Sequence, residues 1–271
     1  MNFTLGLSLY IKNNPIHLNQ CLDSIWFNQS LKPELIIFVY DGSIPKQLDD
    51  LVQDFIIKSG CNHTILRNQR NKGLTISLNK MLSITRTKYF ARMDVDDICV
   101  KDRFLSQINY LEQNKNIDIL GGTAIDIDDN SNEIMIRKVP VDSEKIKRLI
   151  IKVNPVIHPT VMMKTESILS VGGYDENYKT SQDWALWFRA LANGLSIVNM
   201  KEQLIYYRVD NNYNSRKNIH YRLNEVKMKY QGYKELNLSI FNIIYVLLPL
   251  FIWIVPSKFF KIIKKMDPRQ N

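Results

Sequence analysis

The first hundred residues alternate short apolar runs with amphipathic helical patterns. The apolar runs, which predict buried strands, cover residues 3–10, 35–39, 64–66 and 89–93. The helical patterns between them begin at Pro15 and cover residues 48–56 and 74–86. A repeated strand–helix order predicts a parallel sheet with right-handed crossovers, because each helix then packs back onto its own sheet. The predicted fold class is therefore α/β, a Rossmann-like and mostly parallel sheet flanked by helices.

Acidic residues follow two of the predicted strands. Asp41 comes after the second apolar run, and Asp94, Asp96 and Asp97 come after the fourth. Because ligands of parallel sheets bind beyond the carboxyl ends of the strands, we expect these side chains to line one crevice. Three neighbouring carboxylates repel one another unless a cation or hydrogen-bond donors compensate, and oxygen ligands suit Mg²⁺ or Mn²⁺. The alternative is a solvated acidic turn that caps the next helix.

The middle of the chain has a different pattern. Two strands around a polar turn are expected at residues 117–127 and 133–139, followed by a helix at 141–152. A further strand is expected around residues 161–163, a helix from Ser181, and strands within residues 195–208. No internal repeat interrupts this order.

The last 55 residues differ in composition from the rest of the chain. Residues 216–234 are basic and amphipathic, and residues 240–255 are apolar except for Asn242 and Pro249. A perpendicular membrane span needs about 20 apolar residues, so this segment is slightly short. Lysines on one helical face beyond it, at positions 258, 261 and 265, favour a helix lying in the lipid headgroup region. A single span and a soluble helix pair that forms a homodimer are the alternatives.

The net charge of +9 and the isoelectric point of about 9.3 indicate an anionic partner. Nucleic acid, a phosphorylated substrate and a membrane surface all fit such a charge. The basic residues are spread out and form no known nucleic-acid motif, so nucleic-acid binding is not expected. The three cysteines form no closely spaced pair, which is typical of a reducing, cytoplasmic compartment.

Seven short motifs, taken together, resemble a known enzyme family. They are LSLYIKNNPIHLNQCLDSI, YDGS, NKGL, ARMDVDDI, HPTVMMKTESILSVGGYDE, SQDWALWFRA and LIYYRVD. Their order and spacing over residues 1–210 are similar to those of family 2 glycosyltransferases with the GT-A fold, of the kind that builds bacterial surface polysaccharides. The resemblance implies a GT-A domain over residues 1–212 and a helical, membrane-associating extension over residues 213–271.

The resemblance also implies a binding site for the donor nucleotide sugar. Its expected residues are Ser8 and Tyr10 beside the base, Asp41 on the base, Asn71 and Gly73 near the nucleotide, Arg92 beneath it, Asp94 near the ribose or sugar, and Arg208 on the diphosphate. Asp96 matches the metal ligand of the family's DxD motif, and Asp97 matches a residue behind it. Tyr40 stands where the family usually has an acid.

The expected catalytic base is Asp183. Family 2 enzymes invert the anomeric centre, so a carboxylate must take the proton of the acceptor hydroxyl. Gln182 replaces the glutamate that usually precedes this aspartate. Further residues expected near the acceptor or behind the site are His158, Gly173, Tyr174, Gln182 and Trp184. Without the other motifs, Asp183 would be read as a residue at a helix start, where carboxylates are favoured.

The resemblance implies transfer of a hexose, with glucose and galactose favoured, from a UDP-sugar to a saccharide on polyprenyl diphosphate. Mn²⁺ or Mg²⁺ would be the cofactor, and the cytoplasmic face of the bacterial inner membrane the location, held peripherally or monotopically. One alternative is a sugar nucleotidyltransferase, although residues 10–15 lack the glycine-rich loop typical of that class. The other is a catalytically decayed member of a polysaccharide assembly complex, which Tyr40 and Gln182 favour.

Overall fold

The computed structural model describes residues 2–209 and 219–254 of the chain. The predicted domain boundary at residue 212 and the lysines at positions 258, 261 and 265 lie outside these ranges. The first part of the chain consists of β1 (Phe3–Leu9), α1 (Pro15–Trp26), β2 (Leu35–Asp41), α2 (Lys46–Ser59), β3 (His63–Asn68), α3 (Leu74–Ile84) and β4 (Tyr89–Arg92). The predicted alternation of strands and helices is therefore confirmed.

The second part of the described chain is less regular. Its elements are β5 (Ile98–Cys99), α4 (Arg103–Gln113), β6 (Ile119–Ile127), β7 (Glu133–Arg137), α5 (Ser143–Leu149), the 3₁₀ helix η1 (His158–Thr160), β8 (Met162–Lys164), α6 (Thr165–Ser170), α7 (Gln182–Ala192) and β9 (Ile197–Arg208). After the gap come α8 (Ile219–Glu235), the 3₁₀ helix η2 (Ile240–Asn242) and α9 (Ile243–Ile254).

Helix boundaries follow local capping chemistry. The side chain of Asn14 accepts a hydrogen bond from the backbone N–H of Ile16 at 2.8 Å, and Pro15 occupies the first position of α1. Both features stabilise a helix start, because Asn satisfies an unpaired N–H and proline has none to satisfy. Gly60 ends α2 with a φ of 62°, a left-handed conformation that glycine adopts without strain.

The described strands form one sheet in the order β3-β2-β1-β4-β8-β6-β9-β5, with β7 paired to β6. The pairs among β3, β2, β1 and β4 are parallel, as predicted. Beyond β4 the sheet is mixed, because β8 runs antiparallel to both β4 and β6. The chain enters β8 from η1 next to the carboxyl end of β4, so β8 runs in the direction opposite to β4.

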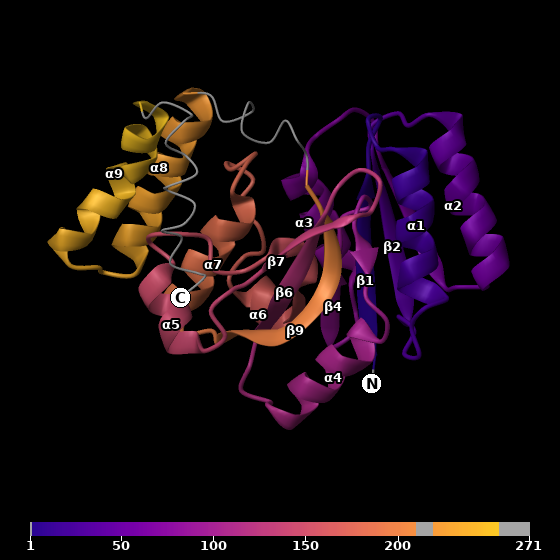
Figure 1. Cartoon of the computed structure of the whole chain (residues 1–271), viewed down its shortest axis with the longest axis horizontal. Coiled ribbons are helices and arrows are strands. Elements are labelled where there is room, and N and C mark those ends of the chain that lie inside the picture. Colours follow the sequence, from indigo (N-terminus) through magenta and orange to yellow (C-terminus); the bar gives the residue numbers. More distant parts are fainter. Residues whose placement is uncertain (1, 210–218, 255–271) are drawn as a thin grey trace.

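Helices cover both faces of this sheet (Figure 1). The alternation of side chains along a strand assigns each residue to one face. In β2, Ile36 and Phe38 pack in the cluster with α1, α2 and α4, whereas Ile37 and Val39 pack in the cluster with α3 and α7. The sheet is therefore buried on both sides, which explains why its strands are apolar without interruption.

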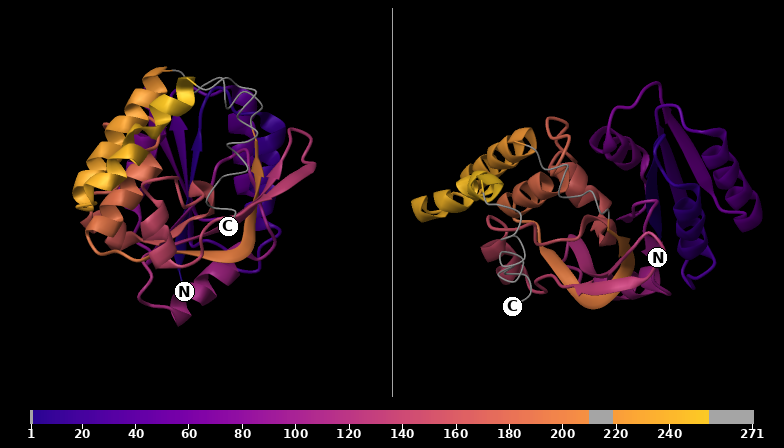
Figure 2. Two further views of the ribbon diagram at one scale, coloured as in Figure 1. Left: turned by 60° about the vertical axis from the view of Figure 1, so that its left-hand side comes forward. Right: turned by 45° about the horizontal axis from the view of Figure 1, so that its top comes forward.

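The two C-terminal helices, α8 and α9, lie side by side, and α8 packs on α7 (Figure 2). They occupy the end of the molecule opposite to α2 (Figure 1). Within the two described ranges, no helix has the length and apolar character needed to cross a membrane.

Phe38 provides a test of this core. Its side chain is fully buried and packs edge-to-face against Phe55, with the ring centroids 6.4 Å apart. We expect Phe38→Ala to lower the free energy of unfolding by about 3–5 kcal/mol, measured by urea denaturation, because it leaves a cavity. The control Ile57→Ala changes a side chain that is 78% exposed and should stay within about 0.5 kcal/mol of the parent. Equal losses in both variants would contradict the assignment of Phe38 to the core.

Candidate active site

The predicted site residues gather at one edge of the sheet. Parallel strands β1, β2 and β4 all end there, which brings together Ser8, Asp41 and Arg92. Strand β6 is antiparallel to β8 and parallel to β9, so β9 also runs in the direction of β4 and ends at this edge with Arg208. Tyr10, just beyond β1, is 38% exposed at the same edge.

Asp41 fixes the loop that follows β3. Its carboxylate accepts hydrogen bonds from the backbone N–H groups of Lys72 at 2.7 Å and Gly73 at 2.8 Å. The side chain of Asn68 donates to the same carboxylate at 2.8 Å, and the Asn71 side chain donates to the Asp41 backbone oxygen at 3.4 Å. Gly73 has a φ of 93°, which a residue with a side chain adopts only with strain. Asn71 and Gly73 are therefore held beside Asp41 at this edge of the sheet, and their contacts and that of Asp41 with a nucleotide stay predictions.

Tyr40 does not face this crevice. Its side chain is buried in the cluster with α1 and α2, and its hydroxyl donates a hydrogen bond to Asp49 of α2 at 2.8 Å. The position that carries an acid in the resembled family therefore contributes packing here.

The acidic turn after β4 brings three carboxylates together. One oxygen from each of Asp94, Asp96 and Asp97 lies within 4.8 Å of the others. Asp94 forms an ion pair with Arg92, and Asp96 is exposed. Asp97 is buried; its Oδ1 accepts from the backbone N–H of Arg208 at 2.9 Å, and its Oδ2 has no hydrogen-bond partner among the described residues. The turn is therefore a cluster of oxygen ligands with one buried acceptor unused.

The electrostatics of this turn fit a divalent cation. Although the Asp96 side chain reaches solvent, the surrounding protein displaces part of the hydration of its carboxylate, and this loss together with the charge of Asp94 raises the pKa of Asp96 to about 6. Burial, together with the charges of Asp96 and Asp94, raises the pKa of Asp97 well above its usual range. A bound cation relieves such repulsion, and Mg²⁺ and Mn²⁺ prefer carboxylate oxygens. Asp96 and Asp97 are thus suited to hold the metal, with Asp94 turned toward Arg92.

Arg92 joins the two halves of the site. Its side chain is almost completely buried, and one terminal nitrogen, Nη1, has no hydrogen-bond partner among the described residues. Burial alone would lower its pKa, but surrounding acidic groups, first of all Asp94, raise it. Asp183 is one of these acidic groups, so the expected metal cluster and the expected base both act on one guanidinium.

Arg208 stabilises the acidic turn through hydrogen bonds of its side chain. Its Nε donates to the backbone oxygen of Asp96 at 3.0 Å, and Nη1 donates to the backbone oxygen of Asp128 at 2.6 Å. Its Nη2 donates to Gln20 at 2.9 Å and to Ser131 at 3.1 Å. All three guanidinium nitrogens therefore bind protein oxygens, so the position shows a supporting role, whereas a direct contact with diphosphate stays a prediction.

Asp183 lies in the first turn of α7. The Asn154 side chain donates a hydrogen bond to its Oδ2 at 2.7 Å. Burial raises the pKa of Asp183, an effect that the Asn154 hydrogen bond and the charge of Arg92 oppose. A carboxylate with a raised pKa and a fixed orientation is suited to accept a proton. Asn154 was not expected from the sequence, where only its position before Pro155 distinguishes it.

His158 and Tyr174 form a buried pair beside Arg92. The His158 Nε2 and the Tyr174 hydroxyl lie 2.8 Å apart. Burial and the charge of Arg92 lower the pKa of His158 well below its usual range, so the imidazole is neutral at neutral pH. Gly173, with a φ of 64°, shapes the turn before Tyr174, and Asn79 accepts a hydrogen bond from the Tyr174 backbone N–H at 2.9 Å.

Gln182 and Trp184 are both buried. The Trp184 indole N–H donates to the backbone oxygen of Ile150 at 2.8 Å, and its ring stacks on Phe188. Its burial and its contacts within the protein favour the supporting role for Trp184, and a contact with an acceptor sugar stays a prediction.

A curved α/β sheet that ends in an acidic turn is the arrangement of GT-A glycosyltransferases, and solved structures confirm this fold. The chain superimposes with a TM-score of 0.70 on S. aureus TarS 1–349 in complex with UDP-GlcNAc, at 15% identity, covering 96% of this chain and 77% of that one. It superimposes with a TM-score of 0.62 on the mannosyltransferase PcManGT from Pyrobaculum calidifontis in complex with GDP-Man and Mn²⁺, at 11% identity, covering 97% and 79%.

Sequence comparison identifies the family. The model described as "Glycosyl transferase family 2" matches residues 11–171, more than half of the chain. The chain is also 28% identical over 260 residues to an Escherichia coli enzyme named UDP-Gal:alpha-D-GlcNAc-diphosphoundecaprenol beta-1,3-galactosyltransferase, covering 95% of this chain and 93% of that protein. The chain belongs to glycosyltransferase family 2.

The contacts of Asp41 lead to a prediction about the loop. Asp41→Asn replaces one acceptor oxygen by an NH₂ group, which leaves a backbone N–H of Lys72 or Gly73 without its acceptor. We expect amide hydrogen exchange in that loop to accelerate by about tenfold, because such a hydrogen bond contributes about 1–3 kcal/mol. Mass spectrometry of the peptide containing both residues measures this. The control Asp50→Asn, on the exposed side of α2, should leave the loop unchanged; unaltered exchange in Asp41→Asn would show that Asp41 does not hold it.

Proposed function

We propose that this protein is an inverting glycosyltransferase that moves a hexose, glucose or galactose, from a UDP-sugar to a saccharide on polyprenyl diphosphate. The observation that carries the proposal is the pairing of the buried Arg92 guanidinium with Asp94 of the carboxylate cluster, within reach of the charge of Asp183. A donor held by a cation at the cluster would present its anomeric carbon to an acceptor hydroxyl bound beside Asp183.

The donor half of the proposal relies on the acidic turn and on the loops beside it. Bound Mn²⁺ or Mg²⁺ would neutralise charge on the UDP leaving group. Asp96 and Asp97 would hold the ion, and Arg92, with an unpaired buried nitrogen, would attract the anionic donor. The nucleotide would lie along Ser8, Tyr10, Asp41, Asn71 and Gly73. The complexes of TarS with UDP-GlcNAc and of PcManGT with GDP-Man and Mn²⁺ support this placement by their shared fold.

The acceptor half relies on Asp183. Its carboxylate takes the proton of the acceptor hydroxyl while that oxygen forms a bond to the anomeric carbon. The bond from this carbon to the phosphate oxygen breaks, and UDP leaves with the electron pair. Attack opposite the leaving group inverts the configuration, so an α-linked donor gives a β linkage. The Asn154 side chain donates to Oδ2 of Asp183 and fixes the orientation of the carboxylate that takes the proton.

The name of the Escherichia coli relative supports the acceptor class. That protein acts on GlcNAc-diphosphoundecaprenol, a saccharide on a lipid diphosphate. We infer a corresponding acceptor here, in the assembly of O-antigen or another surface polysaccharide. A nucleotidyltransferase or a decayed partner protein is less well supported, because Arg208 stabilises the turn that carries Asp96 and Asn154 orients Asp183.

A single substitution tests the chemistry. Asp183→Asn removes the base but keeps the shape and the Asn154 contact, so we expect transfer to fall by at least about a hundredfold. The assay uses a panel of UDP-sugars with Mn²⁺ or Mg²⁺ and a GlcNAc- or GalNAc-diphosphate lipid. Binding of the UDP-sugar should stay within about twofold of the parent, since Asp183 lies on the acceptor side. Parent-like transfer by the variant would eliminate Asp183 as the base, and a parent protein that binds no UDP-sugar with metal present would refute the donor.

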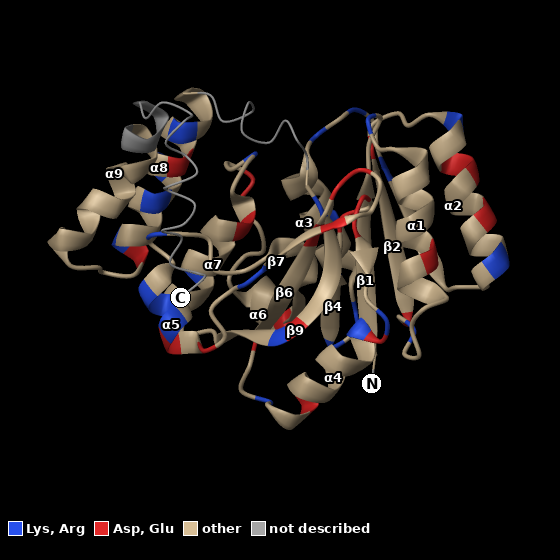
Figure 3. Cartoon of the chain, in the orientation of Figure 1, with Lys and Arg blue, Asp and Glu red and all other residues tan. Residues whose placement is uncertain are grey.

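The C-terminal region supplies the membrane contact in this proposal. Four large apolar side chains of η2 and α9 are exposed along one helical face, namely Ile240, Phe241, Ile244 and Leu247. Basic residues lie on α8 and α5 next to these helices (Figure 3). An apolar row beside basic groups suits a headgroup region that contains anionic lipid. We infer a peripheral or monotopic position on the cytoplasmic face of the bacterial inner membrane, with residues 1–212 as the catalytic domain and 213–271 as the extension.

Vesicle binding tests this surface. We expect Phe241→Ser with Ile244→Ser to weaken binding to vesicles of phosphatidylglycerol and phosphatidylethanolamine by about tenfold or more, because apolar area no longer enters the lipid. The matched control is Ile57→Ser, which removes an exposed apolar side chain from α2 at the other end of the molecule. Sedimentation with vesicles measures binding. The homodimer alternative would be favoured if the parent protein dimerises without binding vesicles and the double variant is monomeric.

A further inference from the structure

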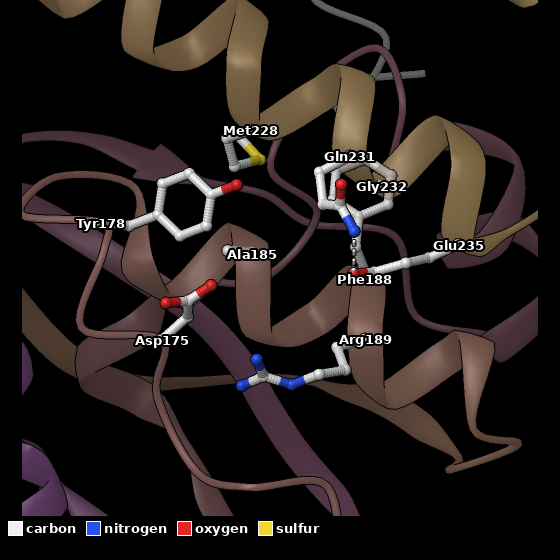
Figure 4. A pocket seen from close by; sticks show the side chains of 9 residues that line it. All are labelled: Asp175, Tyr178, Ala185, Phe188, Arg189, Met228, Gln231, Gly232 and Glu235. Carbon is white, nitrogen blue, oxygen red and sulfur yellow. Dashed lines mark hydrogen bonds between the residues drawn. The ribbon is translucent and has the colours of Figure 1, made fainter.

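Helix α8 packs closely on α7, the helix that carries Asp183. Gly232 of α8 faces the ring of Phe188, and a Cβ atom at this glycine would lie 2.3 Å from Phe188 Cγ. Figure 4 shows the small hollow beside this contact, with Gln231 donating a hydrogen bond to Glu235 at 3.0 Å. The hollow is lined by Asp175, Tyr178, Ala185, Phe188, Arg189, Met228, Gln231, Gly232 and Glu235. The two helices are therefore held at a distance that only a glycine permits.

One turn from this contact, α8 buries a lysine. The Lys229 side chain is 1% exposed, and its ammonium group donates to the backbone oxygens of Lys152 at 3.1 Å and Tyr245 at 3.3 Å. The nearest carboxylate that the structure pairs with it, Glu225, is 3.9 Å away, beyond hydrogen-bond distance. Burial lowers the pKa of Lys229 to about 8, although Glu225 opposes this. A charge buried with so little compensation costs stability, so a methionine would serve packing better.

Lys229 makes two contacts close to Asp183 in sequence or through its partners, one with Trp184 and one with Lys152. The ammonium lies 4.7 Å from the ring centroid of Trp184, the residue that follows Asp183. Its acceptor, Lys152, stands two residues before Asn154, whose side chain donates to Asp183. The segment between them is a turn closed onto α5, with the Val153 N–H donating to the Leu149 oxygen at 3.0 Å. The hydrogen bond from Lys229 to the backbone of Lys152 therefore also restricts the position of Asn154.

We propose that Lys229 is a positioning residue for Asp183, which acts by fixing Lys152 and thereby the Asn154 side chain that orients the Asp183 carboxylate. This inference rests on the proposed role of Asp183 as the base. It gives the C-terminal helices a part in catalysis that is independent of membrane contact. The charged group that faces Asp183 directly is Arg92, and those that face Lys229 are Glu225 and Arg222. None of these is altered by the variants below.

The test uses the full-length protein with Lys229→Met, Asn154→Ala and both changes together. With a water-soluble acceptor analogue, we expect Lys229→Met to lower kcat by about ten- to a hundredfold, because small displacements of a base are costly, while KM for the UDP-sugar stays within about twofold. Loss of the Asn154 hydrogen bond raises the pKa of Asp183, so the acidic limb of the kcat/KM profile moves to higher pH. The double variant should be no worse than the more impaired single variant, as for residues that act through one contact.

Two further variants separate positioning from folding. Lys227→Met removes an exposed lysine two residues away on α8 and should keep parent kcat. Lys229→Gln keeps an N–H donor without the charge and should recover part of kcat, with a melting temperature measured alongside for every variant. The proposal is overturned if Lys229→Met keeps the parent kcat and pH profile, if its acidic limb does not move, or if the two losses multiply. Transfer by Asp183→Asn at the parent rate would instead refute the proposed base, whatever Lys229 does.

Discussion

The hydrogen bond from the Arg208 backbone to the buried carboxylate of Asp97 joins the turn after β4 to the last strand of the sheet. The Arg208 side chain also donates hydrogen bonds to the backbone oxygen of Asp96 and to that of Asp128, in the hairpin between β6 and β7. Three segments that are far apart in sequence therefore meet at this turn. Three neighbouring carboxylates repel one another, and the Arg208 N–H on Asp97 and the Arg92 guanidinium on Asp94 offset part of this repulsion before any cation binds.

A carboxylate also orders the backbone at the expected nucleotide-binding loop. Asp41 uses its carboxylate to hold the N–H groups of Lys72 and Gly73, so the loop after β3 is shaped by the strand beside it. The carboxylates of Asp41 and Asp97 thus both accept hydrogen bonds from backbone N–H groups. Such contacts order a site in advance, which lowers the entropy lost when a ligand binds.

The elements that local chemistry determines were predictable from the sequence. Apolar periodicity and turn residues placed β1 to β4 and their helices, and the strand-end rule placed Asp41, Asp94 and Asp96 in one crevice. The mixed part of the sheet was not predictable, because a three-residue strand such as β8 takes its direction from its neighbours. Asn154 and Lys229 were missed for the same reason, since their partners lie 29 and 77 residues away. Trp184 and Arg208 form hydrogen bonds within the protein that the sequence does not indicate, and their contacts with ligands stay predictions.

The glycine contact between α8 and α7 has a consequence for how this region tolerates change during evolution. Gly232 and Lys229 lie three residues apart and so share one face of α8. A one-residue insertion within the helix between them would rotate one residue by about 100° relative to the other, and no side chain fits where the glycine now packs. An insertion before α8 does not change the angle between Lys229 and Gly232 around the helix axis. Homologues are therefore free to vary the length of the connection before α8, but not the spacing of these two residues within it.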